Sequence, residues 1–314
     1  MTVRILVVDD DPIALELMKV LLKQAGHKNA VFAESGAEAL DILRRSRKGY
    51  DCLIFDINMP VMDGIELCAE VRTMAKFART PVLMLTARSD FAAIAEAFRA
   101  GANDYVTKPF DVADINSRLD VAIRMSKSQE MLPILQTIEA QPDETLGAHP
   151  FKVSEPVKLP VESGLIDSFS LGNYLAKLTK IRVKSSIVFA VKVANIQSLY
   201  LSCTTSEFTS ILSDISKAIY NAAENPHTLS SYIGDGNFIC ITRDDILETQ
   251  PDIGNKVEAI YGRLARAHED SDIRGVTFKT GRAIRPNGSR SHRVKPTINR
   301  ALSALDRTAE IRSA

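Results

Sequence analysis

The stretch Ile5-Leu6-Val7-Val8-Asp9-Asp10-Asp11-Pro12 begins as a run of four apolar residues and ends in three acids and a proline. Apolar side chains at successive positions are typical of a strand that is covered on both faces, as in a parallel sheet. Asp11 and Pro12 suit the N-cap and the first turn of a helix. We therefore expect a buried strand that leads directly into a helix, with Asp9 and Asp10 at the junction.

The same rhythm continues outward from this stretch to about residue 125. The runs 52–55 and 82–85 are also continuously apolar, and helical patterns lie between them. This alternation predicts an α/β domain over residues 1–125, built on a doubly wound parallel sheet. The second helix is expected to open with a capping box between Ser35 and Glu38. The first helix is expected to end near Gly26 and to bury Ile13, Leu17, Val20 and Leu21.

The length of 314 residues predicts a second domain, because one core rarely exceeds about 200 residues. Residues 126–164 are predicted to be a helical extension and a Pro-rich linker, since four prolines punctuate a polar stretch without periodicity. Residues 165–314 predict strand, helix, hairpin, helix and strand, with a further helix at each end. This βαββαβ order is typical of an α+β ferredoxin-like fold. The expected elements are 166–180, 187–193, 206–222, 230–242, 253–268, 276–284 and 297–310.

Polar residues end four strand-like runs of the first domain: Asp9 with Asp10, Asp56, Thr86 and Lys108. In an open α/β sheet such strand ends border the ligand crevice. Each residue alone is also explained as a helix approach, a turn or a solvated charge, but four together favour a shared site. Three neighbouring carboxylates call for a cation, and Mg²⁺ prefers oxygen ligands. A carboxylate beside Mg²⁺ can act as a nucleophile toward phosphorus.

These motifs closely resemble the receiver domain of bacterial two-component response regulators. The resemblance is carried by Ile5 to Pro12, Phe55 to Gly64, Leu85-Thr86-Ala87 and Tyr105 to Phe110. It implies a flavodoxin-like sheet, phosphorylation by a histidine kinase or phosphotransfer protein, and a cis bond before Pro109. The resemblance assigns the site as follows: Asp56 is the phospho-acceptor, Lys108 the phosphoryl counter-charge, Thr86 and Tyr105 the switch pair, and Asp9, Asp10, Asp56 and the backbone carbonyl of Asn58 the Mg²⁺ ligands.

The second domain resembles a diverged diguanylate cyclase (GGDEF) domain. Its Ile233-Gly234-Asp235-Gly236-Asn237 resembles the signature hairpin of that family, and the order of the surrounding elements fits. The resemblance implies metal-binding aspartates where this chain has Lys192 and Ala194. It places guanine-reading side chains where this chain has Tyr200 and Thr209. We therefore expect a degenerate hairpin, formed by Gly234, Asp235 and Gly236, that catalyses nothing, with Asp235 shaping a bend.

The output is then expected to be self-association into a homodimer or binding to an unknown downstream protein. Two alternatives stay open: an active or atypical cyclase that uses Asp235, and nucleotide or nucleic-acid binding through the basic stretch 279–295, which includes Arg290 and Arg293. Nucleic acid and membrane are disfavoured as partners, because the net charge is +0 and no apolar run is long enough to span a bilayer. The sequence favours a cytoplasmic location.

Overall fold

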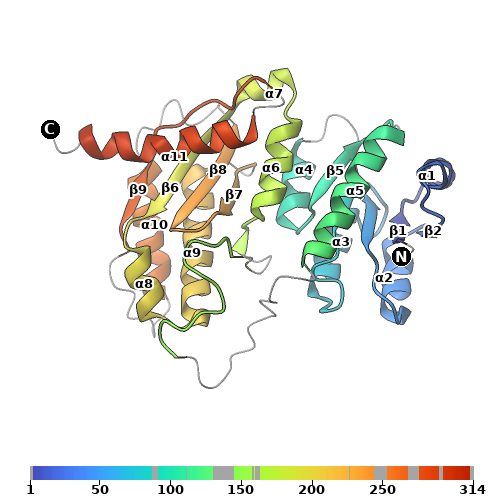
Figure 1. The fold of residues 1–314 in the computed structure, drawn as a ribbon, viewed down its shortest axis with the longest axis horizontal. Coiled ribbons are helices and arrows are strands. Elements are labelled where there is room, and N and C mark those ends of the chain that lie inside the picture. Colours follow the sequence, from blue (N-terminus) through green and yellow to red (C-terminus); the bar gives the residue numbers. More distant parts are fainter. Residues whose placement is uncertain are drawn as a thin grey trace. The chain divides into compact units, whose positions relative to one another are not determined.

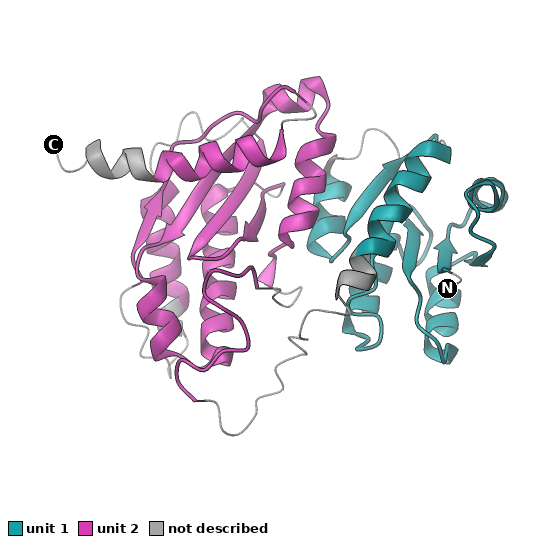
Figure 2. Ribbon diagram, viewed as in Figure 1, with its two compact units in different colours: residues 1–133 teal, residues 134–314 magenta. Residues whose placement is uncertain are grey.

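The computed structural model describes residues 3–86, 91–110, 112–129, 145–157, 159, 163–225, 227–243, 253–267, 276–289 and 293–311 of the chain. The chain divides into two units, residues 1–133 and 134–314 (Figure 2). Each unit has its own sheet and its own hydrophobic core. Within the described residues, no helix combines the length and the apolar character that crossing a membrane requires.

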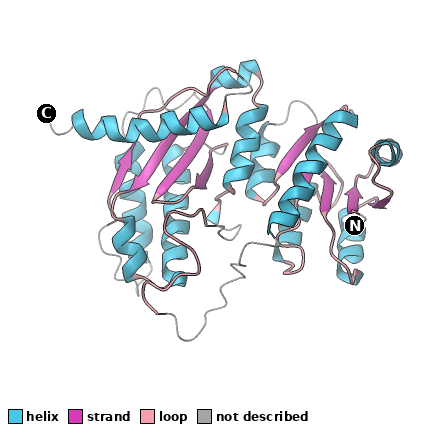
Figure 3. Cartoon of the chain, in the orientation of Figure 1, coloured by secondary structure: helices cyan, strands magenta, loops and turns pink. Residues whose placement is uncertain are grey.

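The first unit is built on five parallel strands in the order β2-β1-β3-β4-β5 (Figures 1 and 3). Ile5 and Val7 of β1 pack in one core with α1 and α5, and Leu6 and Val8 are buried on the opposite face. This strand order is that of the flavodoxin-like fold, so the predicted doubly wound sheet is confirmed. The elements are β1 (Arg4–Val8), α1 (Pro12–Gln24), β2 (Asn29–Ala33), α2 (Gly36–Arg45), β3 (Cys52–Asp56), α3 (Gly64–Thr73), β4 (Val82–Thr86), α4 (Phe91–Arg99), β5 (Asp104–Thr107) and α5 (Val112–Gln129).

Helix α1 buries a different face from the one predicted. Ile13, Leu17 and Val20 are 77%, 44% and 51% exposed, whereas Leu21 is buried as expected. The core side of the helix is formed instead by Leu15, Met18, Leu21 and Leu22. Both sets of residues have helical spacing, so periodicity alone does not choose between them. The choice is made by packing against the sheet and α5, and it leaves an apolar stripe on the outer surface of α1.

The helix starts of the first unit follow the predictions in part. Asp11 caps α1 as expected, because its side chain accepts a hydrogen bond from the Ile13 amide at 2.9 Å. Ser35 accepts from the Glu38 amide at 3.2 Å, but the Glu38 carboxylate accepts from the Glu34 amide, not from Ser35. The predicted capping box is therefore only half present. Among the helix starts whose caps the structure describes, complete capping boxes form at Asp63 with Glu66 and at Thr204 with Glu207.

The second unit contains a four-stranded antiparallel sheet in the order β7-β8-β6-β9. Helices α9 and α10 supply much of its core, together with alternate residues of β6. The strand predicted at 276–284 is shorter, and its far end returns to the sheet only through a single bridge between Ile284 and Val188. The elements are α6 (Ser168–Lys177), α7 (Lys180–Ser185), β6 (Ser186–Val193), α8 (Ile196–Ser202), α9 (Thr205–Ala223), β7 (Leu229–Tyr232), β8 (Asn237–Arg243), α10 (Ile253–Ala267), β9 (Phe278–Thr280) and α11 (Val294–Ile311).

The helix predicted at 166–180 corresponds to α6 and ends three residues early, at Lys177, where a buried arginine binds its last carbonyls. Arg293 is 3% exposed, and its guanidinium donates to the carbonyls of Leu175, Ala176 and Leu178 at 2.6–3.3 Å. Carbonyls at a helix end need such partners, because the helix itself cannot supply them. The capping hydroxyl of Thr179 then starts α7.

The predicted linker is partly wrong. Residues 130–144 lie outside the described residues, but residues 145–157 and 159 pack on the second unit. Phe151, Val157 and Leu159 are 7–8% exposed and belong to its core. These three apolar residues lie among prolines and show no helical or strand period, so their burial could not be predicted from the sequence pattern. This stretch therefore belongs to the second unit.

Candidate functional site

The polar residues predicted at the strand ends meet at one edge of the first sheet. Asp9 follows β1, Asp56 ends β3, Thr86 ends β4 and Lys108 follows β5. These four strands are neighbours and run parallel, so their carboxyl ends open on the same side. The topology thereby collects residues that lie as much as 99 positions apart in the chain.

Three carboxylates form the centre of this pocket. Asp9, Asp10 and Asp56 each offer an oxygen, and the three oxygens lie within 4.8 Å of one another. Asp9 and Asp56 are 2% and 3% exposed, whereas Asp10 is exposed. This donor set fits a hard divalent cation, which takes carboxylate oxygens and keeps several waters. Asp9, Asp10 and Asp56 are therefore the residues that would hold Mg²⁺.

Backbone amides fix the orientation of the two buried carboxylates. The Asp11 amide donates to Asp9 Oδ1 at 3.0 Å, and the Asn58 amide donates to Asp56 Oδ2 at 2.8 Å. The second bond leaves Asp56 Oδ1 directed at the pocket, where it meets Lys108. Asn58 is exposed beside Asp56; the predicted role of its carbonyl as a metal ligand stays a prediction.

Lys108 bridges the two buried acids. Its Nζ lies 2.6 Å from Asp56 Oδ1 and 2.9 Å from Asp9 Oδ2. Burial raises the pKa of Asp56, and the hydrogen bond from Lys108 offsets this only in part. Burial lowers the pKa of Lys108, but its hydrogen bonds to Asp56 and Asp9 outweigh burial, so the pKa of Lys108 is raised. The lysine therefore stays charged and supplies the positive charge of the pocket.

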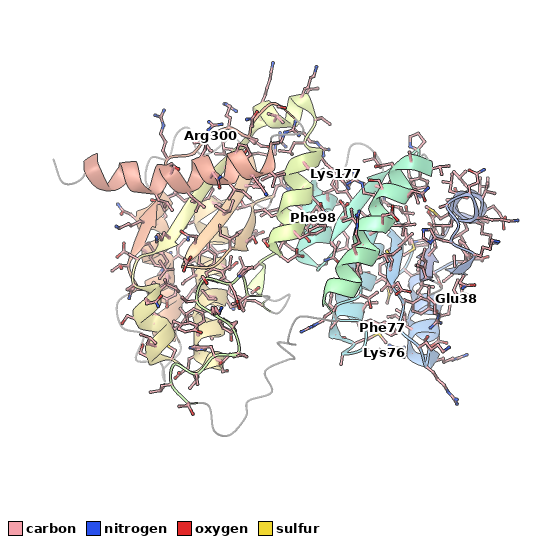
Figure 4. The ribbon with its side chains drawn as sticks, in the orientation of Figure 1. Glu38, Lys76, Phe77, Phe98, Lys177 and Arg300 are labelled. Carbon is pink, nitrogen blue, oxygen red and sulfur yellow. The ribbon has the colours of Figure 1, made fainter. Side chains whose placement is uncertain are left out.

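The predicted switch residues are both buried. Thr86 has no exposed surface and lies opposite Thr107 on β5, while its carbonyl accepts from the Lys108 amide at 2.8 Å. Tyr105 is 6% exposed, and its ring meets Phe98 edge-on at a centroid distance of 6.1 Å. Phe98 projects from α4 (Figure 4). The Lys108–Pro109 bond is cis, as the resemblance implied.

Sequence reasoning missed the role of Gly64 beneath the pocket. Its amide donates to the Ile57 carbonyl at 3.0 Å, and a Cβ added here would lie 2.0 Å from the Asp56 carbonyl oxygen. Only glycine lets α3 begin this close to the end of β3. The pattern Met62-Asp63-Gly64 carried a signal, since the Asp63 capping box and the glycine mark a sharp helix start.

The hairpin of the second unit brings no comparable set of acids together. Asp235 is exposed, and φ is positive at Gly234, Asp235 and Gly236 (94°, 51° and 74°), which confirms the predicted bend. Among the described residues, the group formed by Asp9, Asp10 and Asp56 is the one that could hold a metal through three acidic side chains. Lys192 lies opposite Asn237 on one neighbouring strand and Lys279 on the other.

One arginine of the basic stretch 279–295, which was considered for nucleic-acid binding, does not lie on the surface. Arg293 is buried, and its Nε and Nη2 donate to the carbonyls of Asn287 and Gly288 at 2.9 and 3.1 Å. It therefore organises the loop from within. Arg290 lies outside the described residues.

The known proteins described below match the first unit of this chain. The family model of the response regulator receiver domain matches residues 5–120. Chemotaxis protein CheY-3 of Vibrio cholerae is 38% identical over 117 residues, which cover 37% of this chain and 88% of CheY-3. Response regulator MprA of Mycobacterium bovis is 36% identical over 130 residues, which cover 41% of this chain and 54% of MprA.

A solved structure shows a similar extent of match. The crystal structure of a putative response regulator from Chloroflexus aurantiacus J-10-fl is 37% identical and covers 40% of this chain and 99% of its own, with a TM-score of 0.37. The chain spans about half the length of MprA. The matched share of this chain is thus close to two fifths in each comparison.

Proposed function

Because the chain belongs to the response regulator receiver family through residues 5–120, we propose that it accepts a phosphoryl group on Asp56 from a histidine kinase or phosphotransfer protein. The observation that carries the proposal is the position of Asp56 Oδ1, which is buried, oriented and 2.6 Å from Lys108 Nζ. Asp9 and Asp10 complete a pocket with the charge that phosphoryl transfer requires.

The transfer is a displacement at phosphorus. A carboxylate oxygen of Asp56 attacks the phosphorus of a phosphohistidine, the P–N bond breaks, and the imidazole nitrogen keeps the bonding electron pair. Asp56 becomes an acyl phosphate. Lys108 needs only to turn its ammonium group from the carboxylates toward the new phosphoryl oxygens. Bound Mg²⁺ supplies additional neutralisation of those oxygens.

The phosphoryl group can also shift the conformation of the receiver. It adds up to about two negative charges, and each charge-assisted hydrogen bond that it accepts is worth about 1.5–3 kcal/mol. Near-complete inversion of a two-state equilibrium needs about 5.5 kcal/mol. New bonds from Lys108 and the Thr86 hydroxyl, with Tyr105 moving in concert, come close to that value. Thr86 and Tyr105 are therefore proposed as the switch pair.

We further propose that the second unit is a degenerate GGDEF-like domain with a ferredoxin-like fold and no cyclase activity. The element order and the strand order β7-β8-β6-β9 support the fold. The loss of activity is supported by Lys192 and Ala194 at the expected metal positions and by the exposed bend at Asp235. Its output is then self-association or binding to a downstream protein. We propose that the molecule works in the cytoplasm.

The acceptor assignment is tested with Asp56→Asn. We expect the unaltered chain to take up phosphoryl from acetyl phosphate with Mg²⁺, and Asp56→Asn to take up none, as measured by intact mass. Asp41→Asn is the matched control, because Asp41 lies on the outer surface of α2 and pairs with Arg45. Undiminished uptake by Asp56→Asn would refute the assignment.

The output is tested with two measurements on the full chain. Incubation with GTP and Mg²⁺ or Mn²⁺ is expected to yield no cyclic dinucleotide, and a detected product would favour the atypical cyclase. Light scattering with and without beryllofluoride and Mg²⁺ then separates the remaining outputs. A change in mass supports self-association, and an unchanged mass supports an external protein partner.

A further inference from the structure

A segment predicted to be a linker lies across the hairpin of the second unit. Residues 145–157, here called the strap, contain no helix or strand. They run past α8 and α9 to the turn between β7 and β8 (Figure 1). The Gly147 amide starts this contact by donating to the Cys203 carbonyl at 3.0 Å. The strap therefore lies against α8, α9 and the β7–β8 turn.

The first half of the strap is held by aromatic rings. The His149 Nε2 donates to the Tyr200 carbonyl at 2.6 Å, and Nδ1 lies 3.1 Å from the Thr205 hydroxyl. The His149 ring is 4.1 Å from the Tyr200 ring, centroid to centroid, and Phe151 packs 6.0 Å from Phe208. The Tyr200 hydroxyl donates to the Phe151 carbonyl. The two ring-bearing side chains of the strap, His149 and Phe151, thus both pack against α8 and α9.

The second half of the strap closes over the hairpin tip. The Val153 carbonyl accepts from the Asp235 amide at 2.8 Å and from the Tyr232 hydroxyl at 3.4 Å. A Cβ added at Gly234 would lie 2.3 Å from the Ser154 carbonyl oxygen. The hairpin tip is therefore shaped to take a backbone against it, in the way that binding sites for extended peptides use main-chain hydrogen bonds and side-chain pockets.

The strap contacts the positions at which the resembled cyclase family holds its nucleotide. On the proposed resemblance, Tyr200 falls where that family has a guanine-reading side chain, and Gly234 and Asp235 fall in its signature hairpin. The hydroxyl of Thr209, the other guanine-reading position, donates to carbonyls of its own helix, those of Thr205 and Ser206. The same surface thus offers peptide contacts and lacks free nucleotide-reading groups at these two positions.

We propose that this surface, formed by Tyr200, Phe208 and residues 232–236, is a binding site for an extended peptide, and that residues 147–157 of this chain are its built-in ligand. The inference rests on the proposed function, since it explains what a degenerate cyclase site holds in place of GTP. The strap joins no strand ladder. It is held by a few backbone bonds and by the side chains of His149 and Phe151, and Phe151 packs in the core of the second unit.

The test uses the full chain with residues 147–155 replaced by a Gly/Ser sequence of equal length, which empties the site and keeps Val157 and Leu159. The probe is a fluorescent synthetic peptide of residues 145–159. We expect the replaced chain to bind this peptide at least about tenfold more tightly than the unaltered chain, whose site is filled. Tyr200→Phe in the replaced chain is expected to weaken binding, because only the hydroxyl bond to the Phe151 carbonyl is lost. A replaced chain that melts cooperatively but ignores the peptide would overturn the proposal.

A second measurement needs no large replacement. Hydrogen exchange on the unaltered chain is expected to show slow exchange at the Asp235 and Gly147 amides, with faster exchange at Asp235 after Tyr200→Phe. Unprotected exchange at Asp235 in the unaltered chain would overturn the proposal even if the replaced chain did not fold. Addition of GTP with Mg²⁺ to the replaced chain distinguishes a failure of the inactive-domain proposal from a failure of the strap proposal. Cyclic dinucleotide product would refute the inactive domain, whereas peptide binding tests the strap alone.

Discussion

Lys108 donates to Asp56 at 2.6 Å and thereby occupies the position that a phosphoryl group or a cation must share. The lysine side chain is one-third exposed, so it can leave this position without opening the core. The pocket therefore already holds a positive charge that competes with Mg²⁺ for the same carboxylates. Removal of the Lys108 charge should therefore strengthen Mg²⁺ binding.

Lys108→Met is expected to bind Mg²⁺ about fivefold more tightly, which corresponds to ~1 kcal/mol for a partly exposed ion pair. The same change is expected to slow phosphoryl uptake, because the counter-charge for the phosphoryl oxygens is gone. Titration calorimetry and intact mass measure the two effects. Lys76→Met is the control: it removes a lysine whose Nζ donates to the Ser46 carbonyl, on another part of the unit (Figure 4). Weaker Mg²⁺ binding by Lys108→Met would contradict the competition.

As the pH is lowered, Mg²⁺ affinity is expected to begin falling at a higher pH than it would if Asp56 had the ordinary pKa of an aspartate. Burial raises the pKa of Asp56 above 3.8, so the proton is held more tightly in the folded chain and is bound at a higher pH. A metal ligand must be ionised, and one competing proton lowers the affinity about tenfold per pH unit below the raised pKa. Lys108, with its raised pKa, stays charged across this window. Calorimetry over a pH series checks the prediction, and a flat affinity down to the ordinary pKa of aspartate would count against it.

The exposed stripe of α1 is expected to matter for a protein donor and not for a small one. Helix α1 starts beside the acid pocket, and its Leu17 and Val20 face solvent. Leu17→Ala with Val20→Ala should change stability by about 0.5 kcal/mol or less per site, as exposed positions do. Phosphoryl transfer from a phosphorylated histidine kinase domain should slow several-fold, while uptake from acetyl phosphate stays unchanged. Equal rates with the kinase would show that the stripe is not a docking surface.

Gly64→Ala is expected to destabilise the first unit by about 1–3 kcal/mol, because the new methyl group collides with the Asp56 carbonyl. The displaced strand end should also reduce phosphoryl uptake. Gly49→Ala is the matched control, since no atom lies within 4 Å of the added Cβ. Thermal unfolding of both variants measures the difference, and equal melting temperatures would contradict the close approach.

The sequence predicted the first unit and its pocket well for a physical reason. In a parallel sheet the residues that follow the strands share one edge, so Asp9, Asp56 and Lys108 could be placed together from the ends of the strand-like runs. The carboxylate oxygens agree with this derivation. The cis peptide agrees with the family resemblance, and the bend at Asp235 agrees with the turn preference of Asp-Gly.

The errors arose where local pattern does not determine tertiary contact. Helix α1 carries two apolar stripes, and only packing selects the buried one. The sequence places Arg293 in a basic loop, but its guanidinium donates to the carbonyls at the end of α6. The strap reads as a linker because its prolines interrupt any period, although Phe151 is a core residue. In each case the missing information is a partner that lies far away in the chain.

The close approach of Gly234 to Ser154 also limits how this chain can diverge. A side chain at position 234 has no room while the Ser154 carbonyl lies against it. The φ of 94° at Gly234 disfavours a side chain as well, so in descendants of this gene glycine should be kept at 234 wherever residues 147–155 are kept. The hairpin and the strap are thus expected to change together, or not at all, as the sequence evolves.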